Sequence, residues 1–155
     1  MTGGRLASEI QTRIEQVNGR YDKLVLVVGP PESGKTEALL QVAGSAGYPY
    51  VSLGLELSRR LLDVPARQRP LQTSNIVGAI VEETHASVVL LDNIELLFDP
   101  SLALNPLLLL RRHSRNRVVV AVWPGSVDGN WITYAAPTHR EHRRYWLEQT
   151  VVALA

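Results

Sequence analysis

Residues 28–40 read VGPPESGKTEALL, and this stretch decides the fold. Residues 29–36 fit the pattern G-x-x-x-x-G-K-[ST], whose glycines let backbone N–H groups curl inward around phosphate oxygens. An apolar run at 23–28 precedes the loop and a helical pattern follows it. The positive end of that helix would therefore lie at the loop. The stretch predicts a nucleotide-phosphate loop rather than a plain turn.

The loop predicts ATP and Mg²⁺ as ligands. We expect Lys35 to reach the β- and γ-phosphates and the Thr36 hydroxyl to ligate magnesium. The residues predicted to bind the nucleotide are Gly29, Pro30, Pro31, Glu32, Ser33, Gly34, Lys35, Thr36 and Glu37.

A second magnesium anchor is expected at the end of a later strand. Residues 87–93 read SVVLLDN, which places Asp92 at the carboxyl end of a buried strand, where ligands bind in parallel sheets. Asp92 is predicted to hold magnesium through its water shell, because this cation gives up water reluctantly. The alternative is an aspartate that caps a helix.

The sequence signals for catalysis are weaker than those for nucleotide binding. Asn93 stands where many hydrolysing P-loop proteins carry a glutamate, and an amide can orient water but cannot take its proton. Glu95 can substitute as the base only if the chain turns there; otherwise it is a surface residue. Trp123 and Pro124 occupy the place of a polar γ-phosphate sensor. The sequence therefore predicts slow hydrolysis.

A group of arginines lies between the third and fourth expected strands. One interpretation is an arginine finger that acts on a neighbouring subunit's nucleotide, supplied by Arg111, Arg112 or Arg115. A solvated helix end, where cations favour the helix dipole, explains the same residues.

Strands alternate with helices along the chain, which predicts an α/β fold with a mainly parallel, about five-stranded sheet flanked by helices. We expect one domain over residues 1–155. The expected strands are 23–28, 48–55, 87–93, 117–123 and 131–136. Seven residues separate Trp123 from Trp131, too few for a parallel crossover, so the fifth strand is predicted to be antiparallel.

Local signals predict the helices. Helical patterns cover residues 6–17 and 34–43, and Asn105 is predicted to cap a helix that begins at Pro106. Thr73 or Ser74 is expected to cap another. Thr138 and Glu141 have the spacing of a capping box, which predicts a last helix carrying Trp146, Leu147 and Val151.

The composition is that expected of an ordinary intracellular protein. The 155 residues carry a net charge of +1 and no cysteine, and the 16 basic residues include only two lysines, Lys23 and Lys35. The leucine run at 107–110 is too short to span a bilayer. We expect a soluble, cytoplasmic protein without a membrane partner.

The sequence also resembles known families. GPPESGKT at 29–36 is similar to the phosphate loops of AAA-type ATPases, and residues 90–125 and 131–145 resemble the BrxF family of small P-loop proteins from type 3 BREX phage-defence systems. The resemblance implies an AAA-like core, a homo-oligomer, and partners among other BREX components, including the larger ATPase. It leaves direct contact with DNA open. About twenty residues follow the last expected strand, so a full helical lid is not expected.

Other functions remain open at this stage. A small-molecule kinase of the shikimate or adenylate type has a similar length and the same loop, but residues 50–57 offer Glu56 without an obvious second acceptor-binding charge. A guanine-nucleotide switch would need N-K-x-D, which the sequence does not contain. A scaffold that binds ATP only to assemble is the fourth possibility.

Overall fold

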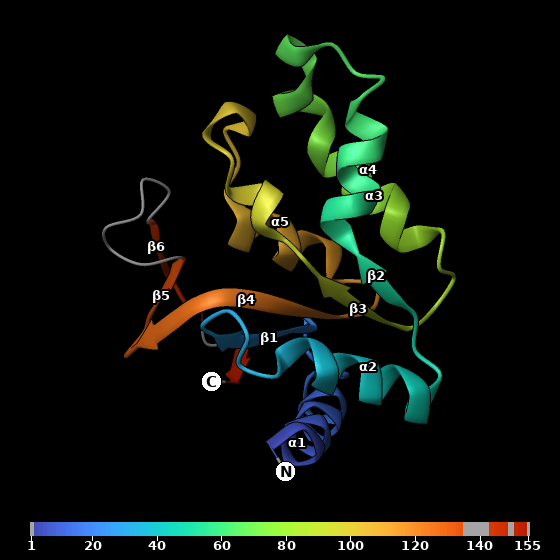
Figure 1. Cartoon of the computed structure of the whole chain (residues 1–155), viewed down its shortest axis with the longest axis vertical. Helices are drawn as coiled ribbons and strands as arrows, with labels where there is room; N and C mark the ends of the chain where they lie inside the picture. The colour runs from blue at the N-terminus through green and yellow to red at the C-terminus, as the bar shows by residue number, and fades with distance from the viewer. Residues whose placement is uncertain (1, 135–142, 149–150, 155) are drawn as a thin grey trace.

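The computed structural model describes residues 2–134, 143–148 and 151–154 (Figure 1). The strands are β1 (Leu24–Gly29), β2 (Tyr50–Ser52), β3 (Val88–Asp92), β4 (Val118–Asp128), β5 (Trp131–Tyr134), β6 (Arg143–Trp146) and β7 (Val152–Leu154). The α-helices are α1 (Thr2–Val17), α2 (Lys35–Ala46), α3 (Leu53–Leu61), α4 (Arg69–Glu82) and α5 (Pro106–His113). Short 3-10 helices are η1 (Ala66–Gln68), η2 (Glu95–Phe98) and η3 (Pro100–Leu102).

The sheet is mainly parallel, as predicted. Its parallel strands follow the order β2-β3-β4-β1-β7, and the phosphate loop leaves the carboxyl end of β1. The second half of β4 continues beyond the parallel part, where residues 125–128 pair antiparallel with β5. Gly129, with φ of 60°, lies in the tight turn between them. The antiparallel hairpin predicted from the short connection is confirmed.

Helices cover both faces of the parallel sheet. Figure 1 shows α1 and α2 on one face, and α3, α4 and α5 on the other. Along β1, Leu24, Leu26 and Val28 belong to the core under α3–α5, whereas Val25 and Val27 belong to the core under α1 and α2. Burial on both faces explains why the strands are continuous apolar runs.

The prediction of a last helix is wrong for the described residues. Residues 143–146 form β6, which pairs with β5, and residues 152–154 form β7, which extends the parallel sheet beside β1. Exposure alternates along β6, with Arg144 and Trp146 exposed, as expected for a strand. The pairing with β5 therefore outweighs the helical spacing of a few apolar residues. Thr138 and Glu141 lie outside the described residues. The described sheet therefore has seven strands rather than about five.

Two other element boundaries differ from the prediction. The expected strand at 48–55 is shorter, because α3 already begins at Leu53 and buries Leu53, Leu57 and Leu61 at helical spacing. Helix α4 begins at Arg69 with a proline in its first turn, a favourable place for proline. Thr73 therefore lies inside the helix, where its hydroxyl donates to the Arg69 carbonyl at 2.7 Å.

Candidate nucleotide-binding site

The phosphate loop joins β1 to α2 in a tightly folded path. Gly34, directly before α2, has a left-handed φ of 85°, which glycine adopts without strain. Glu32 also has a positive φ, 61°. A Cβ on Gly29 would lie 2.9 Å from the Ser33 hydroxyl, so the Ser33 side chain would have to move to admit a larger residue. The backbone conformation itself calls for glycine at position 34.

Lys35 is the first residue of α2 and is buried against the loop. Its ammonium donates to the carbonyls of Gly29, at 2.7 Å, and Pro30, and to the Ser33 hydroxyl at 2.8 Å. Burial lowers the pKa of Lys35, while Asp92 and Glu95 act in the opposite direction. A buried cation at the start of a helix suits a bound anion, because the helix end carries partial positive charge as well.

The structure brings the two predicted magnesium residues together. The Thr36 hydroxyl donates to Oδ2 of Asp92 at 2.7 Å, although 56 residues separate them. Asp92 is 3% exposed, and its Oδ1 accepts the Asn93 backbone N–H at 2.8 Å. No α-helix begins behind Asp92; η2 follows, with Ile94 before its first residue and without a side-chain cap. The alternative role of Asp92 as a helix cap therefore does not fit.

The donor set at this point fits a magnesium ion. Thr36 gives its hydroxyl hydrogen to Asp92, so the lone pairs of its oxygen remain available for a cation. Carboxylate and hydroxyl oxygens are hard ligands of the kind that Mg²⁺ prefers. Their roles as metal residues stay predictions.

Tyr50 is a contact of Asp92 that the sequence did not indicate. Its hydroxyl, on β2, donates to Oδ2 of Asp92 at 2.7 Å. Burial and this hydrogen bond raise the pKa of Tyr50 above its usual value. A tyrosine 42 residues before Asp92 carries no motif, so only the pairing of β2 with β3 could have revealed the contact.

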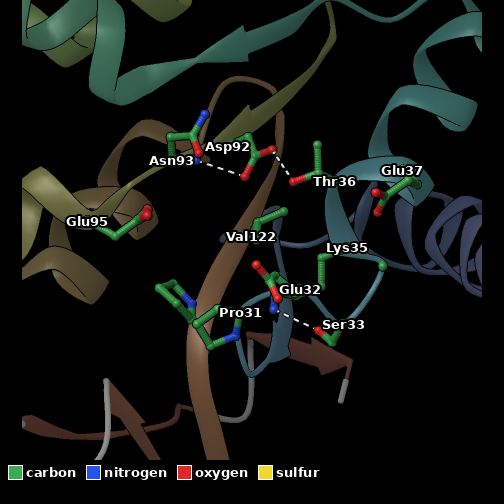
Figure 2. Close-up of a pocket in the computed structure, with 12 residues that line it drawn as sticks. Pro31, Glu32, Ser33, Lys35, Thr36, Glu37, Asp92, Asn93, Glu95 and Val122 are labelled. Carbon is green, nitrogen blue, oxygen red and sulfur yellow. Dashed lines mark hydrogen bonds between the residues drawn. The ribbon is translucent and has the colours of Figure 1, made fainter.

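Asn93 and Glu95 follow β3 in a sharp turn. Asn93 has a φ of 55°, and its side-chain amide donates to the Ser52 hydroxyl at 2.9 Å. The turn places Glu95 at the start of η2, and Figure 2 shows its carboxylate turned toward the pocket lined by the phosphate loop and Asp92. The turn that Glu95 needed in order to face the site is therefore present. Its role as a base stays a prediction.

The structure also shows the position at the end of β4 where a polar γ-phosphate sensor was expected to be missing. Trp123 is fully buried and donates its indole N–H to the Thr133 carbonyl at 3.0 Å, which joins β4 to β5. Pro124 lines the pocket beside Gly29, its partner in the β4–β1 pairing. Neither side chain offers a polar group to a phosphate there. The pocket also includes Pro31, Glu32, Ser33, Glu37 and Val122.

The arginines lie at the other end of the sheet. Arg111 donates to Asp22 through Nε and Nη2, at 3.1 and 2.9 Å, and Asp22 stands just before β1. Arg115 lies 3.6 Å from Asp22 and stacks over the Tyr21 ring. Arg112 is exposed at the last turn of α5. None of the three faces its own chain's phosphate loop, so a finger role could operate only between subunits.

The comparisons with known proteins give short matches. No protein-family model matches the chain. It is 50% identical over 42 residues to the ATP-dependent zinc metalloprotease FtsH of Methylococcus capsulatus, and 45% identical over 42 residues to that of Acidimicrobium ferrooxidans. These matches cover 27% of this chain but only 7% and 6% of the relatives. The C. elegans PCH-2 structure is similar over 99% of this chain and 43% of its own, with 13% identity and a TM-score of 0.47.

The geometry gives a coarse assignment. The mainly parallel α/β sheet with its phosphate loop is a P-loop NTPase fold, and the short matches are to proteins named as ATP-dependent. Within the described ranges, no helix is long and apolar enough to cross a membrane.

Proposed function

We propose that this chain is an ATP-binding, slowly hydrolysing P-loop subunit that works as a nucleotide-dependent switch or assembly factor. The observation that carries the proposal is the 2.7 Å contact between Thr36 and Asp92 beneath a loop that already holds Lys35. Loop amides, a cation and two hard oxygen ligands are the parts that hold a nucleotide triphosphate and its magnesium. Magnesium, when bound, would neutralise developing phosphate charge.

Slow hydrolysis is proposed from what stands around these parts. The Asn93 amide cannot accept a proton, and it is engaged with Ser52. Trp123 and Pro124 offer no polar group at the end of β4. Glu95 remains as the candidate base. We therefore expect the isolated protein to turn over ATP on the order of once per minute or less, well below the enzyme median of about ten per second.

The biological setting is proposed from the sequence resemblance. Residues 90–125 and 131–145 resemble the BrxF family, so we place the chain in a bacterial BREX anti-phage complex in the cytoplasm, with the larger ATPase among its partners. Homo-oligomers would allow Arg112, which is exposed, to approach a neighbouring nucleotide. Arg111 and Arg115 would first have to leave Asp22.

The kinase alternative has less support. A groove beside β2, where an acceptor would bind, is lined in part by Glu56, Arg60 and Glu83. Arg60 lies 2.7 Å from Glu83 and 3.8 Å from Glu56, so these charges pair with one another.

ATP binding is tested with the two lysines of the chain. Lys35→Ala should weaken ATP binding about 100-fold, because charge-assisted contacts to phosphate are worth up to roughly 3 kcal/mol. Lys23→Ala is the matched control, since Lys23 donates to the Arg115 carbonyl at the far end of the sheet. Calorimetric titration of each variant with Mg²⁺ and ATP gives the affinities. Equal affinities in the two variants would contradict the phosphate-loop assignment.

A further inference from the structure

The carboxylate of Asp92 is held from three directions. Thr36 on α2 and Tyr50 on β2 both donate hydroxyl hydrogens to Oδ2, each at 2.7 Å, and the Asn93 N–H donates to Oδ1 at 2.8 Å. A buried carboxylate needs such donors, because burial without them is costly. Both oxygens are thus engaged, which fixes the rotation of the carboxylate.

The two hydroxyl donors are not equivalent. The Thr36 oxygen is itself a predicted magnesium ligand, so its contact with Asp92 depends on what the metal does. Tyr50 belongs to the edge strand and is not part of the phosphate-loop motif. Its hydroxyl therefore orients Asp92 independently of the metal and of the loop.

The pairing of β2 with β3 fixes the position of Tyr50 relative to Asp92. Ser52 pairs with Asp92 in the parallel register, and the Ser52 hydroxyl accepts from the side chain of Asn93. The ring of Tyr50 packs against the core under α1 and α2. One short strand therefore holds two consecutive residues at the end of β3.

We propose that Tyr50 is a positioning residue, whose hydroxyl orients the Asp92 carboxylate for a nucleotide-bound magnesium ion. The inference rests on the proposed function, since it concerns the same metal. Hydrogen-bond partners of metal-binding groups typically change metal affinity 10–100-fold when removed. Tyr50 acts through Asp92 and has no direct part in the chemistry.

The test separates metal-dependent binding from binding in general. ATP affinity of the wild type and of Tyr50→Phe is measured by calorimetry twice, with excess Mg²⁺ and with EDTA. The variant keeps the ring and loses only the hydroxyl, so its affinity in EDTA should stay within about twofold of the wild type. The gain in affinity that Mg²⁺ produces should fall about 10-fold. Tyr48→Phe is the matched control, because Tyr48 packs against the same core two residues earlier and should behave as the wild type.

Each result decides the question. An unchanged Mg²⁺ gain in Tyr50→Phe would overturn the positioning role and leave the proposed function standing. Equal losses with and without Mg²⁺ would also overturn it, because a merely structural contact affects both conditions. If the wild type binds ATP in neither condition, the proposed function fails and this inference fails with it.

Discussion

Two buried aspartates stand at opposite ends of the parallel sheet. Asp22, before β1, is 1% exposed, and Asp92, at the end of β3, is 3% exposed. Asp22 lies within ion-pair distance of Arg111 and Arg115. The hydrogen bonds described for Asp92 come instead from two hydroxyls and a backbone amide.

The difference in partners is the one expected between a structural carboxylate and a carboxylate that binds a cation. The charge of Asp22 is compensated by guanidinium groups, which makes it a fixed part of the fold. Neutral donors orient the charge of Asp92 without cancelling it, so the carboxylate keeps its attraction for a cation. Lys35 is the cation of the phosphate-loop motif, and its ammonium donates hydrogen bonds to the loop rather than to Asp92.

The comparison also bears on the predicted arginine finger. Arg111 is half-buried and makes two hydrogen bonds to Asp22, so moving it toward another subunit would leave that carboxylate short of a partner. The exposed Arg112 carries no such cost. Among the arginines of this group, Arg112 is therefore the better candidate for a role in trans.

The largest effect is expected for hydrolysis at the Asp92 end. Glu95→Gln keeps the shape of the side chain and removes its basicity, so the turnover number should fall about 100-fold if Glu95 activates water. Glu15→Gln is the control, because Glu15 is exposed on α1, away from the residues that line the pocket. Phosphate release under saturating ATP gives both rates. Wild-type turnover in Glu95→Gln would mean that water is activated by another group.

The second prediction exchanges the two aspartates for asparagine. Asp22→Asn should lower stability by about 2 kcal/mol, a drop in Tm of roughly 4–8 °C, because it leaves the half-buried Arg111 guanidinium without its charge partner. It should leave the Mg²⁺ gain in ATP affinity unchanged. Asp92→Asn should remove that gain, because the amide lacks the negative charge that attracts the cation, and it should lower Tm less than Asp22→Asn does, because the donors that contact Asp92 are uncharged.

These variants are compared by thermal unfolding and by calorimetry with and without Mg²⁺. A large fall in Tm for Asp92→Asn, together with a retained Mg²⁺ gain, would reverse the roles that the comparison assigns.

The sequence predicted the parts of the site that lie in short motifs. The phosphate loop and Asp92 depend on a fixed spacing and on one buried strand, and the hairpin after β4 follows from a connection too short for a crossover. Tyr50 could not be predicted, because its contact with Asp92 depends on which strands are neighbours. The same reason explains the missed strand β7, which pairs with the distant β1. Strand β6 pairs with the preceding strand β5, and it was missed because the spacing of Trp146, Leu147 and Val151 was interpreted as helical.

The turn after β3 was left open for a different reason. Glu95 faces the pocket because Asn93 adopts a positive φ, which asparagine tolerates better than most residues. An asparagine directly after a strand is a weak signal for such a turn. The start of α3 had a clearer signal in the sequence, which the expected strand at 48–55 did not take into account. The spacing of Leu53, Leu57 and Leu61 is that of a buried helical face.

The smallest effect concerns a half-buried titratable group, His113, at the end of α5. It lies against Gly78 of α4 and 3.3 Å from the Ser74 hydroxyl, with Glu82 and Arg112 as nearby charges. Burial lowers the pKa of His113 below 6.5, so below that pH the unfolded chain binds a proton that the folded chain resists. Stability should therefore fall as the pH drops from 7 to 5.5, by at most about 1.4 kcal/mol per pH unit from this group.

His113→Gln removes that titration and should reduce the fall in Tm between pH 7 and pH 5.5 by a few degrees. His85→Asn is the matched control, because His85 is exposed and asparagine accepts its positive φ of 52°. The control should lose Tm as the wild type does. His113 carries its burial cost without a charge partner of the kind that Asp22 has, and it lies away from the phosphate loop. The substitution should therefore alter the pH profile of stability and leave the Mg²⁺ gain in ATP affinity as it is. An unchanged pH profile would mean that other groups set the acid sensitivity of the fold.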